Sequence, residues 1–492
     1  MLLPLMDKYG PTINWNLTGS LPSAMNFSRM GNATYVDENG YVTWAPANML
    51  PNGDFTGAVK PSRFPDGWVS VATQDGITVT VEDTGYEDGT PYVDIRYTGT
   101  AGNTSGSLHV FAANNSFPAS LGQSYTMSLH ARRVGGSLAG VASVNIASRE
   151  YANSTGLGAS FENTVLALTT TKTRFHRTYE CVEPTITQIR WGSRVVANLG
   201  ETIDVTIRYY QGMMERTSYN SPRPYIPTRG SAYYGPRFDH DPVTGRPIGL
   251  LYEPQRTKRV LYSNGGSWAK INTAIALAGA ASPDGASNAF IVTDDGANTY
   301  HTVSSNEGSQ YVTGSIYSSS IYLKAGTQNV VQLTFSSGVV VGNPYANFDL
   351  FSGTVASFGG ANASITPIGN GWFRCGLSAV AGSSTYSVSL ILSGTNNNMA
   401  ATRAPAYQGT GLTYQAFGAQ GEVGGTITSL LPTSGGQATR AADLLMLDIP
   451  DGISSLRYTF DDNSTQDVVV SPGSYTVPTN LNRPNIKRVV SV

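Results

Sequence analysis

Side chains able to do acid–base or metal chemistry are few in this sequence of 492 residues, and their spacing matches no common catalytic motif. None of the five histidines is paired at the spacing of a helical metal site: they are His109, His130, His176, His240 and His301. No serine lies in a Gly-x-Ser-x-Gly elbow, and no phosphate-binding or dinucleotide-binding glycine loop follows a strand pattern. The cluster FDHDP at residues 238–242 places His240 between two aspartates, but Asp-Pro and the following Thr-Gly predict a turn. We therefore expect no catalytic residue and no enzyme activity.

Adjacent acidic residues leave one enzymatic alternative open. A glycan depolymerase needs two carboxyl groups about 5 to 9.5 Å apart across the scissile bond. The sequence offers three acidic pairs, Glu82-Asp83, Glu87-Asp88 and Asp294-Asp295. Acidic pairs followed by glycine more commonly hydrogen-bond the backbone of a turn. We expect no cofactor, with one alternative: the same oxygens suit a structural calcium ion in a small β-sandwich.

Aromatic side chains fit a binding function better. The apolar faces of sugar rings pack on Trp and Tyr, while Asn, Gln, Asp and Arg hydrogen-bond the hydroxyl groups. The candidate ligand-binding residues are Tyr210, Tyr414 and Trp191, each in a segment with a strand pattern. A core position is the alternative for all three, because aromatic residues in strands are mostly buried. Three further tryptophans are expected in the core: Trp68, Trp268 and Trp372.

The composition is typical of an all-β protein of nearly neutral charge. The 54 glycines, 26 prolines and 27 tyrosines indicate many short strands joined by turns. Charged residues make up 13% and the net charge is −2, so no basic field attracts nucleic acid. The hydrophobic fraction of 40% argues against disorder, and no apolar run reaches the ~18 residues of a membrane-spanning helix. We expect neither nucleic-acid binding nor membrane insertion.

The cysteines and the first residues bear on where the protein is made. Cys181 and Cys375 cannot form a disulfide framework or a four-thiolate zinc site, and both are expected as buried, unbridged thiols. The first residues, MLLPLMDKYGPTINWN, lack the basic and long apolar stretches of a secretory signal. We expect synthesis in a cytoplasm, although the Tyr-, Asn-, Gly- and Ser-rich composition is typical of extracellular binding proteins. The composition permits, without itself indicating, a virus particle that is assembled inside a cell and released by lysis, a setting in which both expectations hold.

Three features recur in the same order and predict two homologous domains. They are an alternating strand, an aromatic–basic strand with a lone cysteine, and a closing segment with an acidic residue and Pro-Thr-x-Gly. The first copy has them at Tyr125, Cys181, Glu215 and residues 227–230; the second has them at Tyr317, Cys375, Glu422 and residues 432–435. Each copy begins near a tryptophan, at Trp68 and Trp268. Because of the repeat, the Ala-rich INTAIALAGA (residues 271–280) is predicted as a strand in place of a helix.

The predicted fold class is all-β, with two tandem jelly-roll-like β-sandwiches, an N-terminal hairpin region and a small C-terminal β-domain. The boundaries are 1–48 for the hairpin region, 49–230 and 258–443 for the sandwiches, 231–257 for a linker and 444–492 for the C-terminal domain. The hairpin turns at Asn39-Gly40, and the C-terminal segment alternates around turns at residues 461–463 and 472–473.

Five segments resemble a family of tailed-bacteriophage virion proteins, the head spike fibres, tail fibres and related proteins with carbohydrate-binding domains. They are residues 27–42, 236–263, 320–327, 370–375 and 418–443. The first two usually lie close together in this family, so residues 49–230 are interpreted as an inserted or duplicated domain.

The resemblance implies a structural protein on the particle surface, such as a head fibre, spike or decoration protein, that aids host adhesion. Its alternatives are a tail fibre or receptor-binding protein and a glycan depolymerase. The resemblance also implies a homotrimer in the virion, assembled in the host bacterial cytoplasm. The expected partners are other virion proteins of the capsid or tail and a host surface glycan.

Overall fold

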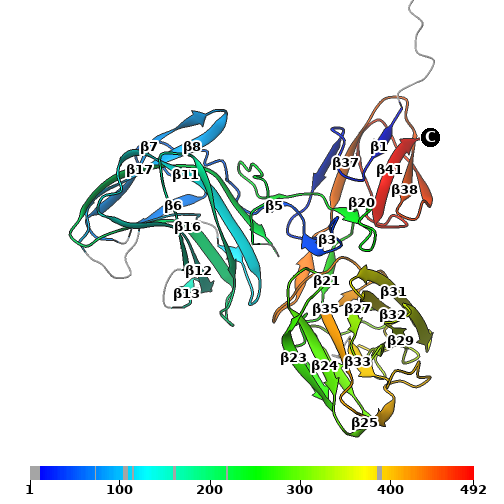
Figure 1. Ribbon diagram of the computed structural model, residues 1–492. Coiled ribbons are helices and arrows are strands. Elements are labelled where there is room, and N and C mark those ends of the chain that lie inside the picture. Colours follow the sequence, from blue (N-terminus) through cyan, green and yellow to red (C-terminus); the bar gives the residue numbers. More distant parts are fainter. Residues whose placement is uncertain are drawn as a thin grey trace, which may run out of the picture. The chain divides into compact units, whose positions relative to one another are not determined.

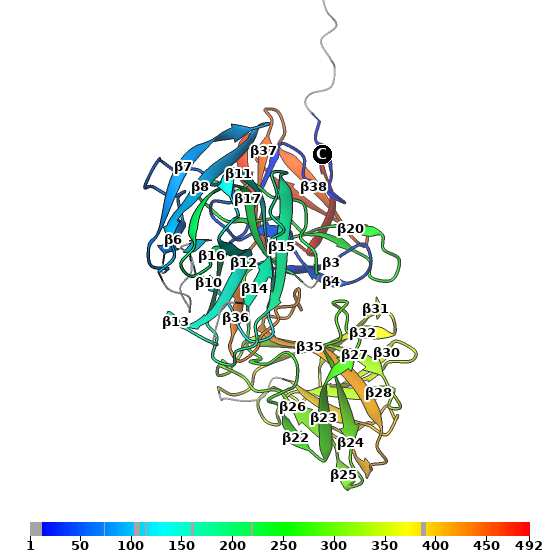
Figure 2. The same ribbon diagram turned by 60° about the vertical axis from the view of Figure 1, so that its left-hand side comes forward.

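The computed structural model describes residues 12–492 except 73, 103–108, 114–115, 159–161, 218–219 and 385–389. The described residues form strands and turns without a helix, which confirms the all-β prediction. Within these ranges no helix is long and apolar enough to cross a membrane. The chain divides into unit 1, residues 1–45 and 236–492, and unit 2, residues 46–235 (Figure 1, Figure 2). Unit 2 is therefore inserted into the sequence of unit 1.

Unit 2 contains the first sandwich, which we call sandwich 1. One sheet has the order β13-β12-β16-β9-β6, with β14 paired to β12 and β10 to β16. Its strands are β6 (Trp68–Ala72), β9 (His109–Ala113), β10 (Phe117–Pro118), β12 (Val141–Ala152), β13 (Thr155–Gly156), β14 (Glu162–Val165) and β16 (Gln188–Ala197). The other sheet has the order β15-β11-β17-β8-β7. Its strands are β7 (Ile77–Glu87), β8 (Thr90–Thr100), β11 (Ser124–Ser137), β15 (Thr173–Glu180) and β17 (Thr202–Arg216).

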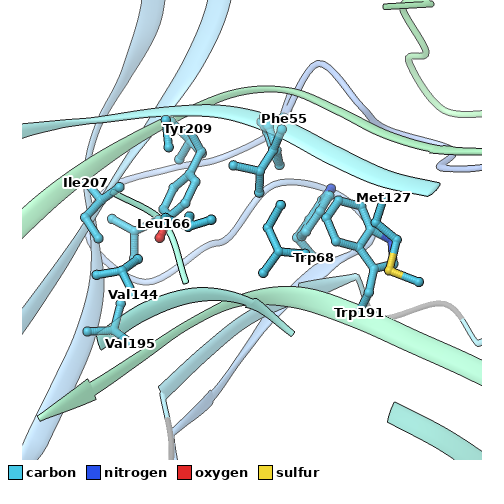
Figure 3. Packing of buried hydrophobic residues seen from close by; sticks show 14 of the residues in the cluster. Phe55, Trp68, Met127, Val144, Leu166, Trp191, Val195, Ile207 and Tyr209 are labelled. Carbon is cyan, nitrogen blue, oxygen red and sulfur yellow. The ribbon is translucent and has the colours of Figure 1, made fainter. Parts of the chain in front are cut away.

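Side chains alternate across β17 and fill the space between the two sheets. Ile203, Val205, Ile207 and Tyr209 point into the core and are at most 1% exposed. Trp68 lies at the centre of this core, where its ring meets Trp191 edge-on at 5.7 Å (Figure 3). Truncating such a buried aromatic residue to Ala costs about 3–5 kcal/mol.

Sandwich 2 lies in unit 1 and has the same sheet orders. Its larger sheet has the order β23-β24-β35-β27-β32-β31, with β21 paired to β35 and β36. The strands of this sheet are β21 (Arg256–Lys258), β23 (Thr273–Ala280), β24 (Ala289–Asp294), β27 (Ile316–Ala325), β31 (Asn362–Gly369), β32 (Trp372–Val380), β35 (Thr413–Val423) and β36 (Ala438–Arg440). The facing sheet has the order β22-β26-β33-β28-β29-β30. Its strands are β22 (Ala269–Ile271), β26 (Thr302–Ser304), β28 (Val330–Thr334), β29 (Tyr345–Asp349), β30 (Thr354–Phe358) and β33 (Ile391–Gly394), and β25 (Asn298–Tyr300) pairs separately with β34 (Ala406–Gln408).

The Ala-rich segment forms β22 and β23, so the repeat predicted its conformation correctly. Trp268 and Trp372 are buried, as Trp68 is.

A β-bulge occurs at the same place in both sandwiches, which supports the predicted duplication. The pairing of β11 with β17 shifts register after Ser128, and the pairing of β27 with β35 shifts after Ser320. The extra residue has a positive φ in both copies, 51° at Gln211 and 64° at Gly418. The backbone N–H of the next residue donates to the segment that leads into each sandwich, from Gly212 to Gly53 O (2.8 Å) and from Ala419 to Ser263 O (3.2 Å).

The cysteines occupy matching strands at different positions. Cys375 lies in β32, and Cys181 directly follows β15, which has the same place in its sheet. In β32 Cys375 pairs with Ile321, whereas in β15 Phe175 pairs with the equivalent Leu129. Both cysteines are buried and free, each in the core of its own sandwich.

The small β-domain of unit 1 is assembled from three distant parts of the sequence. One sheet has the order β19-β20-β41-β38-β39, with β1 paired to β41, and another the order β2-β37-β40. The strands are β1 (Asn14–Asn16), β2 (Met25–Ser28), β19 (Phe238–His240), β20 (Pro247–Leu251), β37 (Leu444–Ile449), β38 (Ser455–Phe460), β39 (Thr465–Val469), β40 (Gly473–Thr476) and β41 (Asn485–Ser491). The segment 231–257 is thus not a plain linker, because Leu250 and Leu251 on β20 pair with β41 and the strand buries its apolar side in this domain.

Two short strand pairs complete the described chain. The predicted N-terminal hairpin is formed by β3 (Thr34–Val36) and β4 (Val42–Trp44), and Gly40 has the positive φ of 79° that its turn requires. β5 (Ala47–Asn48) pairs antiparallel with β18 (Tyr233–Tyr234), so the chain enters and leaves unit 2 through adjacent strands.

Three of the five segments that carry the family resemblance meet in a buried charge cluster, formed by Arg29, Arg237, Glu253, Arg440 and Asp443. Asp443 accepts hydrogen bonds from Arg29 (3.1 Å) and Arg237 (2.5 Å), and Glu253 accepts from Arg237 (2.6 Å) and Arg440. Their side chains are at most 4% exposed. Burial alone raises the pKa of Glu253, but the charges of Arg237 and Arg440 outweigh it and lower the pKa to about 2. The cluster joins the N-terminal region, the segment around β20 and the end of sandwich 2 within unit 1.

Candidate binding face of sandwich 1

The sheet β15-β11-β17-β8-β7 buries one side in the core and turns the other outward; we call the outward side the outer face of sandwich 1. Strand register places four outward residues side by side across it. Tyr92 is opposite Gly85, Tyr210 is opposite His130, and His130 is opposite Arg174. The ring centroids of Tyr92 and Tyr210 are 6.3 Å apart, so Tyr92 on β8 is the neighbour of Tyr210 on β17. We call Tyr92, Tyr210, His130 and Arg174 the tyrosine row.

Gly85 makes room for the tyrosine row at its β7 end. A Cβ atom at this position would lie 3.1 Å from the hydroxyl oxygen of Tyr92, closer than ordinary contact. The Tyr92 ring therefore extends over β7, and its hydroxyl donates a hydrogen bond to Asp83 Oδ2 (2.8 Å). The ring is half-buried and available at the edge of the face.

Arginine–carboxylate pairs fill the next row. Arg208 donates two hydrogen bonds to Asp94, at 2.7 and 2.8 Å, and its guanidinium lies 3.5 Å from the centroid of the Tyr92 ring. Glu87 accepts hydrogen bonds from Arg132 and from the Tyr210 hydroxyl. A guanidinium that donates two parallel hydrogen bonds to a carboxylate and stacks on an aromatic ring has a fixed geometry. This part of the face is a rigid array of paired charges.

The paired charges have shifted pKa values. The hydrogen bond from Tyr210 lowers the pKa of Glu87, with further lowering by Arg132 and Arg208. Burial raises the pKa of Asp94 even though Arg208 donates two hydrogen bonds to it. Burial, followed by the bond to Glu87, raises the pKa of Tyr210. At neutral pH Glu87 is therefore ionised and is held by the Arg132 guanidinium and the Tyr210 hydroxyl.

The other end of the row carries cations. The ammonium of Lys172 lies 4.3 Å from the centroid of the Tyr210 ring, and Arg174 donates a hydrogen bond to Ser128 Oγ (3.0 Å). Burial, then Arg174 and Lys172, lower the pKa of His130 to about 4. His130 is therefore neutral at pH 7.

The three aromatic residues predicted as ligand platforms do not come together. Trp191 is 1% exposed in the core of sandwich 1, and Tyr414 is 4% exposed in the core of sandwich 2, so both have the core role that was their alternative. Tyr210 points to the outer face but is fully covered, by Lys172 above its ring and by its bonds to Arg132 and Glu87. A sugar could stack on Tyr210 only after Lys172 moves aside.

The sequence analysis missed Tyr92, Lys172 and Arg174. A signal was present in the strands, since Tyr92-x-Asp94 and Arg208-x-Tyr210 place aromatic and charged residues at every second position. This spacing is typical of one face of a strand.

The equivalent face of sandwich 2 is covered by the chain itself. Register places Phe417, Tyr322 and Arg374 where the first copy has Tyr210, His130 and Arg174, and Ala289 on the next strand matches Tyr92. Six further residues pack with Phe417 and Tyr322 in one apolar cluster: Val42, Ala280, Ala289, Ile368, Trp372 and Leu430. Val42 comes from the N-terminal hairpin β3–β4, and its N–H donates to Pro283 O (2.9 Å). The same row thus carries polar groups in sandwich 1 and docks a hairpin in sandwich 2.

The acidic pairs have structural partners. Asp294 accepts hydrogen bonds from three backbone N–H groups, of Thr410, Gly411 and Leu412, and from the Tyr407 hydroxyl. Asp88, with a φ of 48°, lies in the β7–β8 turn beside Gly89. Among the described residues no three His, Cys, Asp or Glu side chains group as a metal site would require. A structural calcium ion stays a prediction.

Comparisons with known proteins give structural likeness alone. No protein-family model matches the chain, and no curated protein matches its sequence. The chain is similar to the N-terminal CBM22-1–CBM22-2 tandem domain of Xyn10C from Paenibacillus barcinonensis, at 10% identity and a TM-score of 0.27, over 78% of this chain and 98% of that one. It is also similar to a CBM4 structure, at 19% identity and a TM-score of 0.22, over 34% of this chain and 99% of that one. CBM22 and CBM4 denote carbohydrate-binding modules.

Proposed function

We propose that this chain is a carbohydrate-binding surface protein of a bacteriophage particle, and that the outer face of sandwich 1 attaches to a host glycan without cleaving it. The contrast between the two copies carries the proposal. In sandwich 2 the row is mostly apolar, with Arg374 at one end bonded to Thr428 O, and it is covered by the hairpin β3–β4. In sandwich 1 the row keeps a half-exposed tyrosine beside guanidinium and carboxylate groups. Such groups recognise sugar rings and hydroxyls.

Among the described residues, each chain would then have one glycan-binding face, on sandwich 1. A duplicated domain suggests two such faces. Single sugar sites of this kind are weak, so useful adhesion requires several copies on one particle. We propose a homotrimer, as the family resemblance implies. Mass photometry of the purified protein tests this, with a monomer as the contradicting result.

The resembling segments leave the position on the particle open. We propose a head fibre, spike or decoration protein, with a tail fibre or receptor-binding protein as the alternative. Cryo-EM of particles that contain the protein decides between head and tail. Its absence from purified particles would refute the virion role.

A depolymerase is the enzymatic alternative. On the outer face, Arg132 donates a hydrogen bond to Glu87, Arg208 to Asp94, and the Tyr92 hydroxyl to Asp83. No two of these three carboxyl groups are therefore left without partners to act as a general acid and base. We therefore propose binding without hydrolysis. Release of reducing ends from host polysaccharide by the purified protein would overturn this.

The binding experiment uses a substitution at Tyr92 with a matched control. We expect Tyr92→Ala to weaken glycan binding by roughly tenfold or more, as loss of a stacking aromatic of about 1.5 kcal/mol would. Tyr300→Ala removes a tyrosine that is 43% exposed on sandwich 2 and should leave binding unchanged. Equal effects of both substitutions, or of neither, would contradict the assignment of the site.

A further inference from the structure

The two ends of the outer face differ in charge balance. Toward β7 and β8, Arg132 and Arg208 pair with Glu87 and Asp94, and Arg96 donates two hydrogen bonds to Asp204, at 2.9 Å each. Each guanidinium there has a carboxylate partner. Little charge remains for a ligand to neutralise at that end.

Toward β15 the cations have no carboxylate ion pair among the described residues. Lys172 is exposed, and its ammonium contacts the face of the Tyr210 ring. Arg174 contacts Ser128 Oγ and the sulfur of Met213, and its Nε is buried without a hydrogen-bond partner. His130 Nδ1 is likewise buried without a partner. We call Lys172, Arg174 and His130 the basic end of the outer face.

The other titratable groups facing the basic end do not neutralise it. His176 is exposed beside it on β15, opposite Ser128. Burial lowers the pKa of Arg174, and Glu215 on β17 opposes this shift. The Glu215 carboxylate is 1% exposed and is bound by Arg223, through its backbone N–H at 2.9 Å and its guanidinium at 3.6 Å. Glu180 lies at the far end of β15, opposite Ser124. The pKa of His130 is lowered first by burial and then by the charges of Arg174 and Lys172.

We propose that the basic end binds the anionic substituent of an acidic glycan, a carboxylate or an equivalent acidic group on a sugar ring. This inference rests on the glycan-binding function proposed above and names its ligand class. A carboxylate there can accept hydrogen bonds from the Lys172 ammonium and from the partly exposed guanidinium of Arg174, while Tyr92 contacts a neighbouring ring along the row. The anion also attracts the Lys172 ammonium away from Tyr210, which uncovers that ring for stacking.

A near-neutral protein can make this selection locally. The net charge of −2 gives no long-range attraction, so the discrimination comes from short charge-assisted hydrogen bonds. Such bonds are worth roughly 1.5–3 kcal/mol each, which corresponds to about a tenfold to hundredfold change in affinity.

The test compares each host polysaccharide in its native form and after chemical reduction of its carboxyl groups to alcohols. Reduction removes the charge while the ring hydroxyls remain. We expect binding to the native acidic form to be at least about tenfold tighter than to the reduced form, and to weaken as the salt concentration rises. Lys172→Gln and Arg174→Gln should each remove most of the difference. Lys270→Gln, at an exposed lysine on β22 of sandwich 2, is the matched control and should remove none.

The outcomes separate this inference from the proposed function. Equal binding of native and reduced glycans, or tight binding of neutral glycans only, would overturn the acidic-ligand inference and leave glycan binding intact. Binding to no host glycan would overturn both. Loss of the difference in Lys270→Gln as well would show an effect of overall charge and would refute the assignment to the basic end. Because the reduction experiment uses the unmodified protein, its result does not depend on the folding of any variant.

Discussion

Replacing Asp443 in the buried charge cluster should destabilise unit 1 strongly. Its carboxylate accepts hydrogen bonds from Arg29 at 3.1 Å, from Arg237 at 2.5 Å and from the backbone N–H of Glu253 at 2.8 Å, and its side chain is 0% exposed. Asp443→Ala removes this carboxylate from two guanidiniums whose side chains are 0% exposed. Removing one partner of a buried ion pair costs about 3–5 kcal/mol. Burial and Arg237 already lower the pKa of Arg29 to about 10, and Asp443 opposes this shift, so its loss lowers that pKa further.

The assay is hydrogen exchange followed by mass spectrometry, since a chain of two units does not unfold in one step. A loss of about 3 kcal/mol accelerates exchange through unfolding by roughly a hundredfold. We expect this acceleration in the peptides of β2, which ends just before Arg29, and of β37, which begins just after Asp443. The peptides of β17 in unit 2 provide an internal reference that should not change. Asp443→Asn, which keeps the shape and one acceptor, should cause a smaller acceleration.

The matched control is Asp467→Asn. Asp467 also accepts two hydrogen bonds from an arginine, Arg457, both at 2.7 Å, but the two side chains are 47% and 44% exposed. Water replaces these bonds, so exchange should stay within measurement error. Similar effects of the buried and exposed substitutions, or none in β2 and β37 for Asp443→Ala, would refute the argument from burial.

Three further predictions follow from the sandwiches. Burial raises the pKa of Cys181 to about 12 and that of Cys375 well above its usual value, so a thiol reagent at pH 8 should label neither in the folded protein and both after denaturation; fewer than two thiols per denatured chain would indicate a bridge. At the shared bulge, Gln211→Gly should stabilise sandwich 1 by about 1 kcal/mol, and Gly418→Ala should destabilise sandwich 2 by at least as much, as measured by urea unfolding; changes of the same sign would contradict the equivalence of the bulges. The pKa of His130, about 4 when folded, lies below its ordinary value of 6.5, so the folded state binds fewer protons and stability should fall as the pH drops from about 6.5 to about 4. The full shift would be worth about 3 kcal/mol, which solvent screening of this partly exposed group reduces to roughly 1–2 kcal/mol, and His130→Gln should remove that part of the pH dependence.

Strand alternation and the repeat could be predicted from the sequence because both depend on local residue patterns. Trp68 and Trp268 were correctly expected in the core, and the Ala-rich segment was correctly expected as a strand. The role of residues 231–257 could not be predicted, because β20 finds its partner in β41, where Leu250 pairs with Ile486. Pairing across such a distance leaves no local signal. The burial of Arg237 was hidden for the same reason, since its carboxylate partners are distant in sequence.

The candidate binding residues were only partly predictable, because the strand register of the two sandwiches cannot be derived from the sequence repeat alone. Tyr210 and Tyr414 both precede a glutamine on the closing strand, which invites treating them as equivalent. The pairings instead match Tyr210 with Phe417, three residues beyond Tyr414. An odd displacement turns a side chain to the opposite side of a sheet, so Tyr414 lies in the core and Tyr210 faces outward.

The pairing of β5 with β18 has a mechanical consequence. If unit 2 holds a ligand, as proposed above, a pull on that ligand passes to unit 1 through the chain that joins the two units. Unit 2 is joined to unit 1 by two backbones, at residues 45–46 and 235–236, and the two ends of unit 2 are adjacent, since Gly235 N–H donates to Pro46 O (2.8 Å). Such a pull is therefore carried by two backbone connections instead of one. The arrangement also makes unit 2 exchangeable, because another module with adjacent ends can replace it without disturbing the framework around it.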